Sequence, residues 1–162
     1  MLVKEAIESA HQAIGGYIRE TPAEYSPYLS NVSGAEVFLK LENFQVTGSF
    51  KARGAMNKLC VLSQAQRERG VICASSGNHG AALAYGAHRL GLTATVCVPD
   101  YASPSKVEVI RSFGADVKFF GDDCVKTEAY ARALSEEHGL TYVSPYNDAD
   151  VAAGQGTIGV EL

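Results

Sequence analysis

An alternation of short apolar runs with longer helical patterns, between residues 70 and 143, constrains the fold most strongly. The apolar runs cover residues 71–74, 93–98, 117–120 and 141–143. The segments between them have apolar side chains at helical spacing, and each is followed by a glycine, at Gly91, Gly114 and Gly139. Glycine is favoured just past the end of a helix, and strands that alternate with helices pair in parallel. The sequence therefore predicts an α/β fold with an open parallel sheet of about four strands flanked by helices.

The segments on either side do not follow this alternation. Apolar residues recur at helical spacing in residues 3–14 and 52–62, whereas residues 36–41 alternate as a strand does. Residues 154–162 begin a helical pattern that stops without a capping residue, glycine or proline. We expect that last pattern to be a helix cut inside a larger fold.

The composition is that of a soluble globular protein, and it argues against several function classes. Hydrophobic residues make up 46% of the 162 residues and charged residues 20%. The formal net charge of −4 and the lack of a Lys/Arg cluster argue against a nucleic-acid surface. No apolar run approaches the roughly 18 residues that a membrane span needs, and no signal peptide is recognisable. The four cysteines show no C-x-x-C spacing, so we expect reduced thiols, a cytoplasmic location and no metal site.

The first stretch that could carry chemistry is residues 47–55, where Lys51 opens a helical pattern after a loop with glycine and serine. A helix N-terminus disfavours a cation, so an amine at this position is favoured in its neutral, nucleophilic form. For a lone lysine, an ordinary solvated side chain is still the better interpretation in roughly nine cases of ten.

The second stretch, residues 75–80, lies between an apolar run and a helical pattern. Free backbone N–H groups at such a turn bind carboxylates or phosphates, and Gly77 allows a ligand to approach the backbone. Ligands of parallel sheets also bind at the carboxyl ends of the strands. On this stretch alone, an ordinary capped turn is favoured by about two to one.

Residues 154–159 match the dinucleotide-binding pattern G-x-G-x-x-G, but their context does not fit it. That fingerprint follows a strand directly, whereas residues 144–153 separate this match from the preceding apolar run. We therefore expect no nucleotide site there. A nucleotide-binding module stays open as an alternative that NAD binding would support.

Taken together, several motifs resemble the N-terminal portion of fold-type-II pyridoxal-phosphate enzymes, in the family of threonine or serine dehydratases and serine racemases. In chain order these motifs are LENFQ at 41–45, GSFKARGA at 48–55, SSGNHG at 75–80, PYND at 145–148 and GQGT at 154–157. Because several motifs occur in the family's order over almost the whole chain, the ordinary interpretation of each single stretch loses most of its weight.

The resemblance implies a role for each matching residue. Lys51 would form the Schiff base with pyridoxal 5'-phosphate and carry the substrate α-proton, with Phe50 packed beside the ring. Asn78 would hydrogen-bond the phenolic oxygen of the cofactor. The substrate carboxylate would be held by Ser75, Ser76, Gly77, Asn78 and His79. The implied reaction is β-elimination of a small amino-acid substrate, L-threonine or L-serine, to a 2-keto acid and ammonia.

Ser76 resembles the racemase-like members, in which the serine at this position faces the substrate carbon from the side opposite the lysine. A second acid–base group there would permit racemisation as well as elimination. An amino-acid racemase with Lys51 and Ser76 as its two catalytic residues is therefore an alternative.

Family members are considerably longer, and their glycine-rich phosphate loop lies beyond residue 162. We therefore expect this chain alone to bind pyridoxal 5'-phosphate weakly or not at all and to be inactive. The expected parts are a helix and strand of the large domain at 1–47, a small α/β domain at 48–148 and the truncated start of a large-domain helix at 149–162. Uncovered apolar surface favours a homo-oligomer, so a non-catalytic domain that self-associates is a further alternative.

Overall fold

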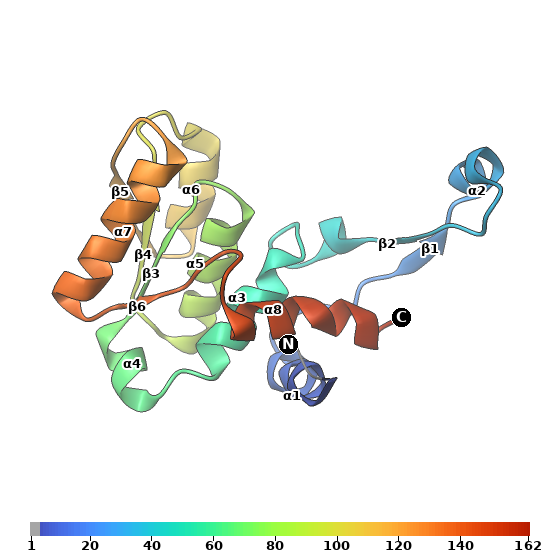
Figure 1. Cartoon of the computed structure of the whole chain (residues 1–162), viewed down its shortest axis with the longest axis horizontal. Coiled ribbons are helices and arrows are strands. Elements are labelled where there is room, and N and C mark those ends of the chain that lie inside the picture. Colours follow the sequence, from blue (N-terminus) through green and yellow to red (C-terminus); the bar gives the residue numbers. More distant parts are fainter. Residues whose placement is uncertain (1–3) are drawn as a thin grey trace.

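The computed structural model describes residues 4–162 and contains the parallel sheet that the sequence predicts. The strands are β3 (Val71–Ala74), β4 (Ala94–Val98), β5 (Asp116–Phe119) and β6 (Thr141–Tyr142). They pair in parallel in the order β5-β4-β3-β6 (Figure 1). The two central strands, β3 and β4, are almost entirely buried, which explains why their sequences are continuous apolar runs. The predicted fold class is confirmed.

Helices cover both faces of this sheet. They are α5 (Asn78–Leu90), α6 (Pro104–Ser112) and α7 (Cys124–His138). Leu83 of α5 packs with Val96 of β4 on one face, and Ala131 of α7 packs with Ile72 of β3 on the other. Gly91 ends α5 in the left-handed conformation, with a φ of 67°, as its place in the sequence predicts. Within residues 4–162, no helix is both long and apolar enough to cross a membrane.

A further helical layer packs beside the sheet. It consists of α1 (Lys4–Ile14), α3 (Lys51–Cys60) and α8 (Ala149–Gly156), and the short α4 (Gln64–Arg69) leads from α3 into β3. The helices α3 and α8 cross at two glycines, because a Cβ on Gly154 would lie 2.6 Å from the Cα of Gly54. A Cβ on Gly156 would lie 2.9 Å from the side chain of Ile7. The G-x-G-x-x-G pattern therefore allows close helix packing, and it lies at the end of a helix instead of after a strand.

The last helix, α8, covers Ala149–Gly156, so it begins five residues before the apolar pattern at 154–162 and ends within it. The Asp148 carboxylate caps α8 by accepting hydrogen bonds from the N–H groups of Asp150 and Val151. After α8 the chain tightens into the 3-10 helix η2 (Thr157–Val160). Alanine and glycine give α8 little periodicity, whereas the capping Asp148 marks its start.

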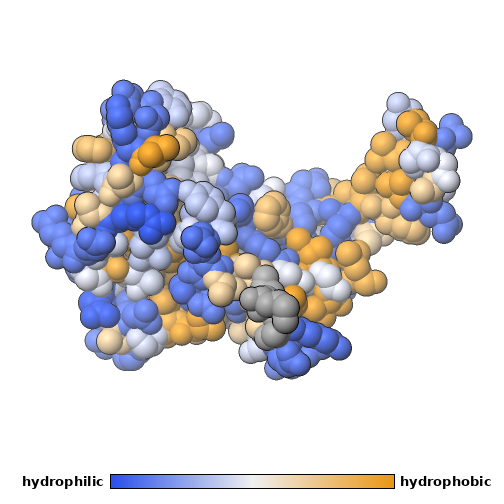
Figure 2. Space-filling view, in the orientation of Figure 1, coloured by the Kyte–Doolittle hydropathy of each residue, from blue (hydrophilic) through white to orange (hydrophobic). Residues whose placement is uncertain are grey.

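The N-terminal segment contains a projecting arm, residues 23–40, of which the sequence predicted only one strand. The arm comprises β1 (Ala23–Tyr25), α2 (Pro27–Ser33) and β2 (Phe38–Lys40), and the 3-10 helix η1 (Glu42–Phe44) follows it. The strands β1 and β2 pair antiparallel, and the arm extends away from the sheet (Figure 1). Apolar side chains cover part of its surface (Figure 2), and Tyr28 and Val32 are exposed by 76% and 68%.

Candidate active site

Lys51 is the first residue of α3, as the sequence predicted. The loop before it turns at Gly48, whose φ of 72° favours glycine. The Lys51 side chain is half-buried, and its Nζ donates a hydrogen bond to the carbonyl oxygen of Pro145 over 2.8 Å. The centroid of the Phe50 ring lies 5.2 Å from the same Nζ, within the range of a cation–π contact. The protein therefore holds this amine instead of leaving it in bulk water.

Residues 75–77 form the predicted turn between β3 and α5. The Gly77 N–H donates to the Ser75 hydroxyl over 3.2 Å, and no side chain caps the first turn of α5. A Cβ on Gly77 would meet no atom within 4 Å, so space lies open beside the turn. Gly80 allows the tight return of the chain, because a Cβ there would collide with the backbone oxygen of Ser75. The uncapped N–H groups of α5 are suited to binding an anionic oxygen.

His79 follows this turn, but its side chain points into the protein. The residue is 3% exposed, and Nε2 lies 3.0 Å from the carbonyl oxygen of Val143. Because a carbonyl only accepts, Nε2 carries the proton and donates it. The buried Nδ1 has no hydrogen-bond partner among residues 4–162. Burial, together with the nearby charge of Lys51, lowers the pKa of His79 to about 4, so its ring is neutral.

The segment after β6 brings Lys51 and His79 together. The Val143 carbonyl accepts from His79 and the Pro145 carbonyl accepts from Lys51, with only Ser144 between them. Ser144 is buried, and its Oγ accepts hydrogen bonds from backbone N–H groups that follow it. The sequence did not predict this meeting, because the Lys51–Pro145 contact joins positions 94 residues apart and leaves no local pattern.

Asn78 lies at the exposed start of α5 and lines a cavity of about 280 Å³ together with Gly77 and Thr47. The Thr47 Oγ1 atom is buried and has no hydrogen-bond partner within the described part of the chain. Lys106 of α6 adds a positive charge to the same cavity. Ser76 is half-buried in the adjacent turn. Of the sequence-predicted site residues, Gly77 and Asn78 therefore line this cavity together with the Lys106 cation, whereas Lys51, Ser76 and His79 are not among its lining residues.

A larger cavity, of about 530 Å³, lies between α1, α3 and α8. Its charged side chains include Asp148 and Asp150, which both pair with Lys58 at 3.0 and 2.8 Å. Since Lys58 compensates these two carboxylates, we regard the cavity beside α5 as the better candidate despite its smaller volume.

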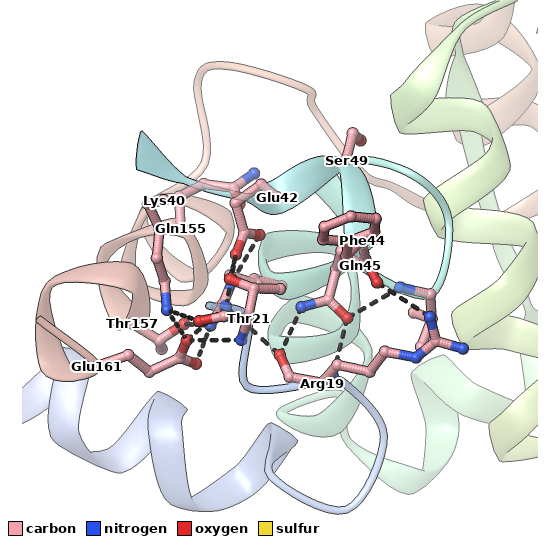
Figure 3. A network of polar contacts seen from close by, with 12 residues as sticks. Arg19, Thr21, Lys40, Glu42, Phe44, Gln45, Ser49, Gln155, Thr157 and Glu161 are labelled. Atoms are coloured by element: carbon pink, nitrogen blue, oxygen red, sulfur yellow. Dashed lines mark hydrogen bonds and ion pairs between the residues drawn. The ribbon is translucent and has the colours of Figure 1, made fainter. Parts of the chain in front are cut away.

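A buried ionic cluster lies just beyond Lys51 on α3 and was not predicted (Figure 3). Arg53 is fully buried, and its guanidinium donates to Glu42 over 2.7 Å and to Glu161 over 2.9 Å. Lys40 lies 2.6 Å from Glu161 as a second cation. Burial alone would raise the pKa of Glu161, but hydrogen bonds from Arg53 and Lys40 hold it at about 2. The cluster therefore ties the start of α3, and with it Lys51, to β2, η1 and the residue after η2.

Comparison with known proteins assigns this geometry to a family. The family model described as "Pyridoxal-phosphate dependent enzyme" matches residues 14–162. The chain belongs to this family. The resemblance inferred from the sequence motifs is thereby confirmed, and the cofactor on which the family depends is pyridoxal phosphate.

Similar members of the pyridoxal-phosphate dependent family include two bacterial enzymes. The L-threonine ammonia-lyase of Thermotoga maritima is 44% identical, over 100% of this chain and 40% of the relative. The catabolic L-threonine dehydratase TdcB of Staphylococcus aureus is 46% identical, over 96% of this chain and 45% of the relative. Among solved structures, maize serine racemase is 34% identical with a TM-score of 0.92, over 97% of this chain and 48% of that one. The chain thus spans less than half the length of these relatives.

Proposed function

We propose that this chain supplies the lysine-bearing part of the active site of a pyridoxal-phosphate dependent ammonia-lyase that acts on L-threonine or L-serine. The observation that carries the proposal is the half-buried Lys51 amine, held at the start of α3 by the Pro145 carbonyl. The similarity to an L-threonine ammonia-lyase and an L-threonine dehydratase supports the reaction and the substrates.

The residues present fit the cofactor by their chemistry. The amine of Lys51 is the group that reacts with an aldehyde, and Phe50 offers an aromatic ring next to it. The open space at Gly77 and the buried, unpartnered Thr47 hydroxyl leave polar groups for a ligand to satisfy. The amide of Asn78, exposed beside this space, would donate to the phenolic oxygen of the cofactor.

When bound, pyridoxal phosphate would supply an electron sink that stabilises negative charge at the substrate α-carbon. The Lys51 Nζ would hold the cofactor and then accept the α-proton, which requires that it leave the Pro145 carbonyl. The N–H groups and hydroxyls of residues 75–79 would bind and orient the substrate carboxylate, with the backbone acting at His79 because its ring is bonded to Val143.

An amino-acid racemase is the second candidate, and the similarity to maize serine racemase favours it. Ser76 is half-buried in the turn, where its hydroxyl would deliver a proton to the face of the substrate opposite Lys51. Elimination needs only the lysine, whereas racemisation needs both groups.

The notable features of the chain also include its length, its exposed arm and its thiols, which bear on its activity in isolation, its partners and its location. Because the chain spans less than half of its relatives, we propose that by itself it binds pyridoxal phosphate weakly and is inactive. The exposed apolar arm supports a homo-oligomer, or alternatively a non-catalytic domain that self-associates. The cysteines of residues 4–162 are free thiols, which is consistent with the proposed cytoplasmic location.

The test is an assay of keto-acid formation from L-threonine and L-serine, and of D-serine formation, with pyridoxal phosphate added. The chain would be assayed alone and mixed with the part of the Thermotoga maritima relative that it does not match. We expect keto acid only from the mixture and none after Lys51→Ala. A Ser76→Ala variant that loses only D-serine would favour the racemase. Turnover that survives Lys51→Ala, or a mixture without keto acid, would contradict the proposed lyase.

A further inference from the structure

His79 and Lys51 are bonded to the same short piece of backbone. The Nε2 of His79 donates to the Val143 carbonyl, and the Nζ of Lys51 donates to the Pro145 carbonyl two residues later. Val143 and Ser144 are buried, whereas Pro145 is half-buried where the segment reaches Lys51. Two side chains from different helices, α5 and α3, therefore meet through one extended segment of three residues.

The bond from His79 fixes the orientation of this segment at its start. The Val143 N–H already donates to the Ile72 carbonyl over 2.8 Å as the last bond of the sheet. The Val143 carbonyl accepts from the His79 ring, which is the partner that the structure gives it. Since the 143–144 peptide unit is planar, fixing its carbonyl also fixes the Cα of Ser144, from which the chain continues to Pro145.

We propose that His79 is a positioning residue that orients the Val143–Pro145 segment so that the Pro145 carbonyl holds the Lys51 amine. The proposal deepens the proposed function and rests on it only for the chemical task of Lys51. His79 does not touch the reacting atoms, because its ring faces the protein interior. It acts through the backbone. The Lys51 amine stays hydrogen-bonded to the Pro145 carbonyl until a ligand binds.

The charges around His79 fit this role. Lys51 and Asp148 are the charged groups that act on its ring, with opposite effects. The ring is buried and Nδ1 meets no donor among the described residues, so Nε2–H is the tautomer that the site favours. A neutral ring in that tautomer donates to Val143 without placing a second cation beside Lys51.

The test compares two amide substitutions. The terminal amide of glutamine reaches the position of Nε2, whereas that of asparagine reaches only the position of Nδ1. Purified, cofactor-free protein would be treated with limiting formaldehyde and a borane reductant, and methylation would be quantified by peptide mass spectrometry. The readout is the rate at Lys51 divided by the rate at Lys4, whose side chain is 83% exposed.

We expect His79→Asn to raise this ratio about fivefold, the effect of releasing one ordinary hydrogen bond, and His79→Gln to keep it near wild type. A purely structural role would lower the melting temperature of both variants and leave the ratio unchanged. A folded His79→Asn protein with the wild-type ratio, or a His79→Gln protein with the same rise as asparagine, would overturn the proposal.

If His79→Asn does not fold, nitrogen-15 NMR of the wild-type protein tests the proposal by identifying which ring nitrogen of His79 carries the proton. The proposal requires a proton on Nε2 of His79, and a spectrum with the proton on Nδ1 rules it out. No step uses pyridoxal phosphate, so a failure of Lys51 to bind the cofactor leaves this result intact. An unchanged methylation ratio, in turn, leaves the proposed lyase standing.

Discussion

Arg53 shows how single residues fix the site. A fully buried guanidinium is stabilising only if it is paired and hydrogen-bonded, and here two carboxylates supply the partners. Because Arg53 lies in the first turn of α3, its pairing fixes the end of the helix that presents Lys51. The sequence did not reveal the cluster, since Glu42 and Glu161 lie 11 and 108 residues from Arg53.

Neutralising one partner should therefore destabilise the chain strongly. We expect Glu161→Gln to lower the free energy of unfolding by about 3 kcal/mol, because Arg53 stays buried with part of its charge uncompensated. Urea unfolding followed by circular dichroism measures the change. Glu108→Gln on the exposed side of α6 is the matched control, with an expected change within about 0.5 kcal/mol. Equal effects of the two substitutions would show that the cluster contributes nothing specific.

His79 predicts a distinct pH dependence of stability. Its pKa of about 4 in the folded chain lies below the ordinary 6.5, so the unfolded chain binds the proton first as the pH falls. The resulting loss begins below pH 6.5, reaches about 3 kcal/mol near pH 4 and then levels off. The lowered pKa of Glu161 adds a separate loss only below about pH 4.5. The free energy of unfolding, measured with denaturant, should therefore fall more between pH 7 and pH 5 for wild type than for His79→Gln. An equal fall for the two proteins would be inconsistent with this account.

At the scale of elements, the crossing of α3 and α8 determines how the lysine helix is seated. The backbones approach so closely that a Cβ on Gly154 would lie 2.6 Å from the carbonyl oxygen of Arg53. In the same motif, a Cβ on Gly159 would meet no atom within 4 Å. The glycines of one sequence pattern thus differ in what they do.

Alanine substitutions within the motif should separate packing from other roles. We expect Gly154→Ala to lower the free energy of unfolding by roughly 2 kcal/mol through overpacking. Gly159→Ala should be near neutral. Thermal unfolding of both variants checks the difference. If Gly159→Ala destabilised the chain as much as Gly154→Ala, the packing explanation of this pattern would fail.

The elements that the sequence predicted well are those with a burial pattern or a contiguous motif. β3 and β4 are continuous apolar runs because helices cover both faces, and Lys51 and the turn at 75–80 lie in unbroken motifs. Of the arm, only the strand at 36–41 was predicted, because β1 and β2 are three residues long and almost entirely exposed. The segment 143–145 escaped because its function depends on contacts that only the folded chain creates.

At the scale of the whole molecule, the arm is the part whose apolar side chains are least covered. It presents apolar side chains to solvent on a pair of strands that packs little against the sheet domain (Figures 1 and 2). A surface of this kind promotes association, and the chain spans less than half of its relatives.

Self-association through the arm can be tested directly. We expect the purified chain to form dimers or larger species, and Tyr28→Ser with Val32→Ser to shift it toward monomer. Light scattering coupled to size exclusion measures the mass. Val125→Ser is the control, because Val125 is 78% exposed but lies on α7. A monomeric wild-type chain, or an equal shift with the control, would rule out the arm as the interface.

The central claim is that Lys51 is the lysine that forms the Schiff base with pyridoxal phosphate. The most direct measurement is reduction of the chain with borohydride in excess pyridoxal phosphate, followed by peptide mass spectrometry of the lysines. The account predicts an adduct concentrated at Lys51, with much less on Lys4 and the other lysines. An adduct distributed over the lysines according to their exposure, with Lys51 no more reactive than Lys4, would contradict it.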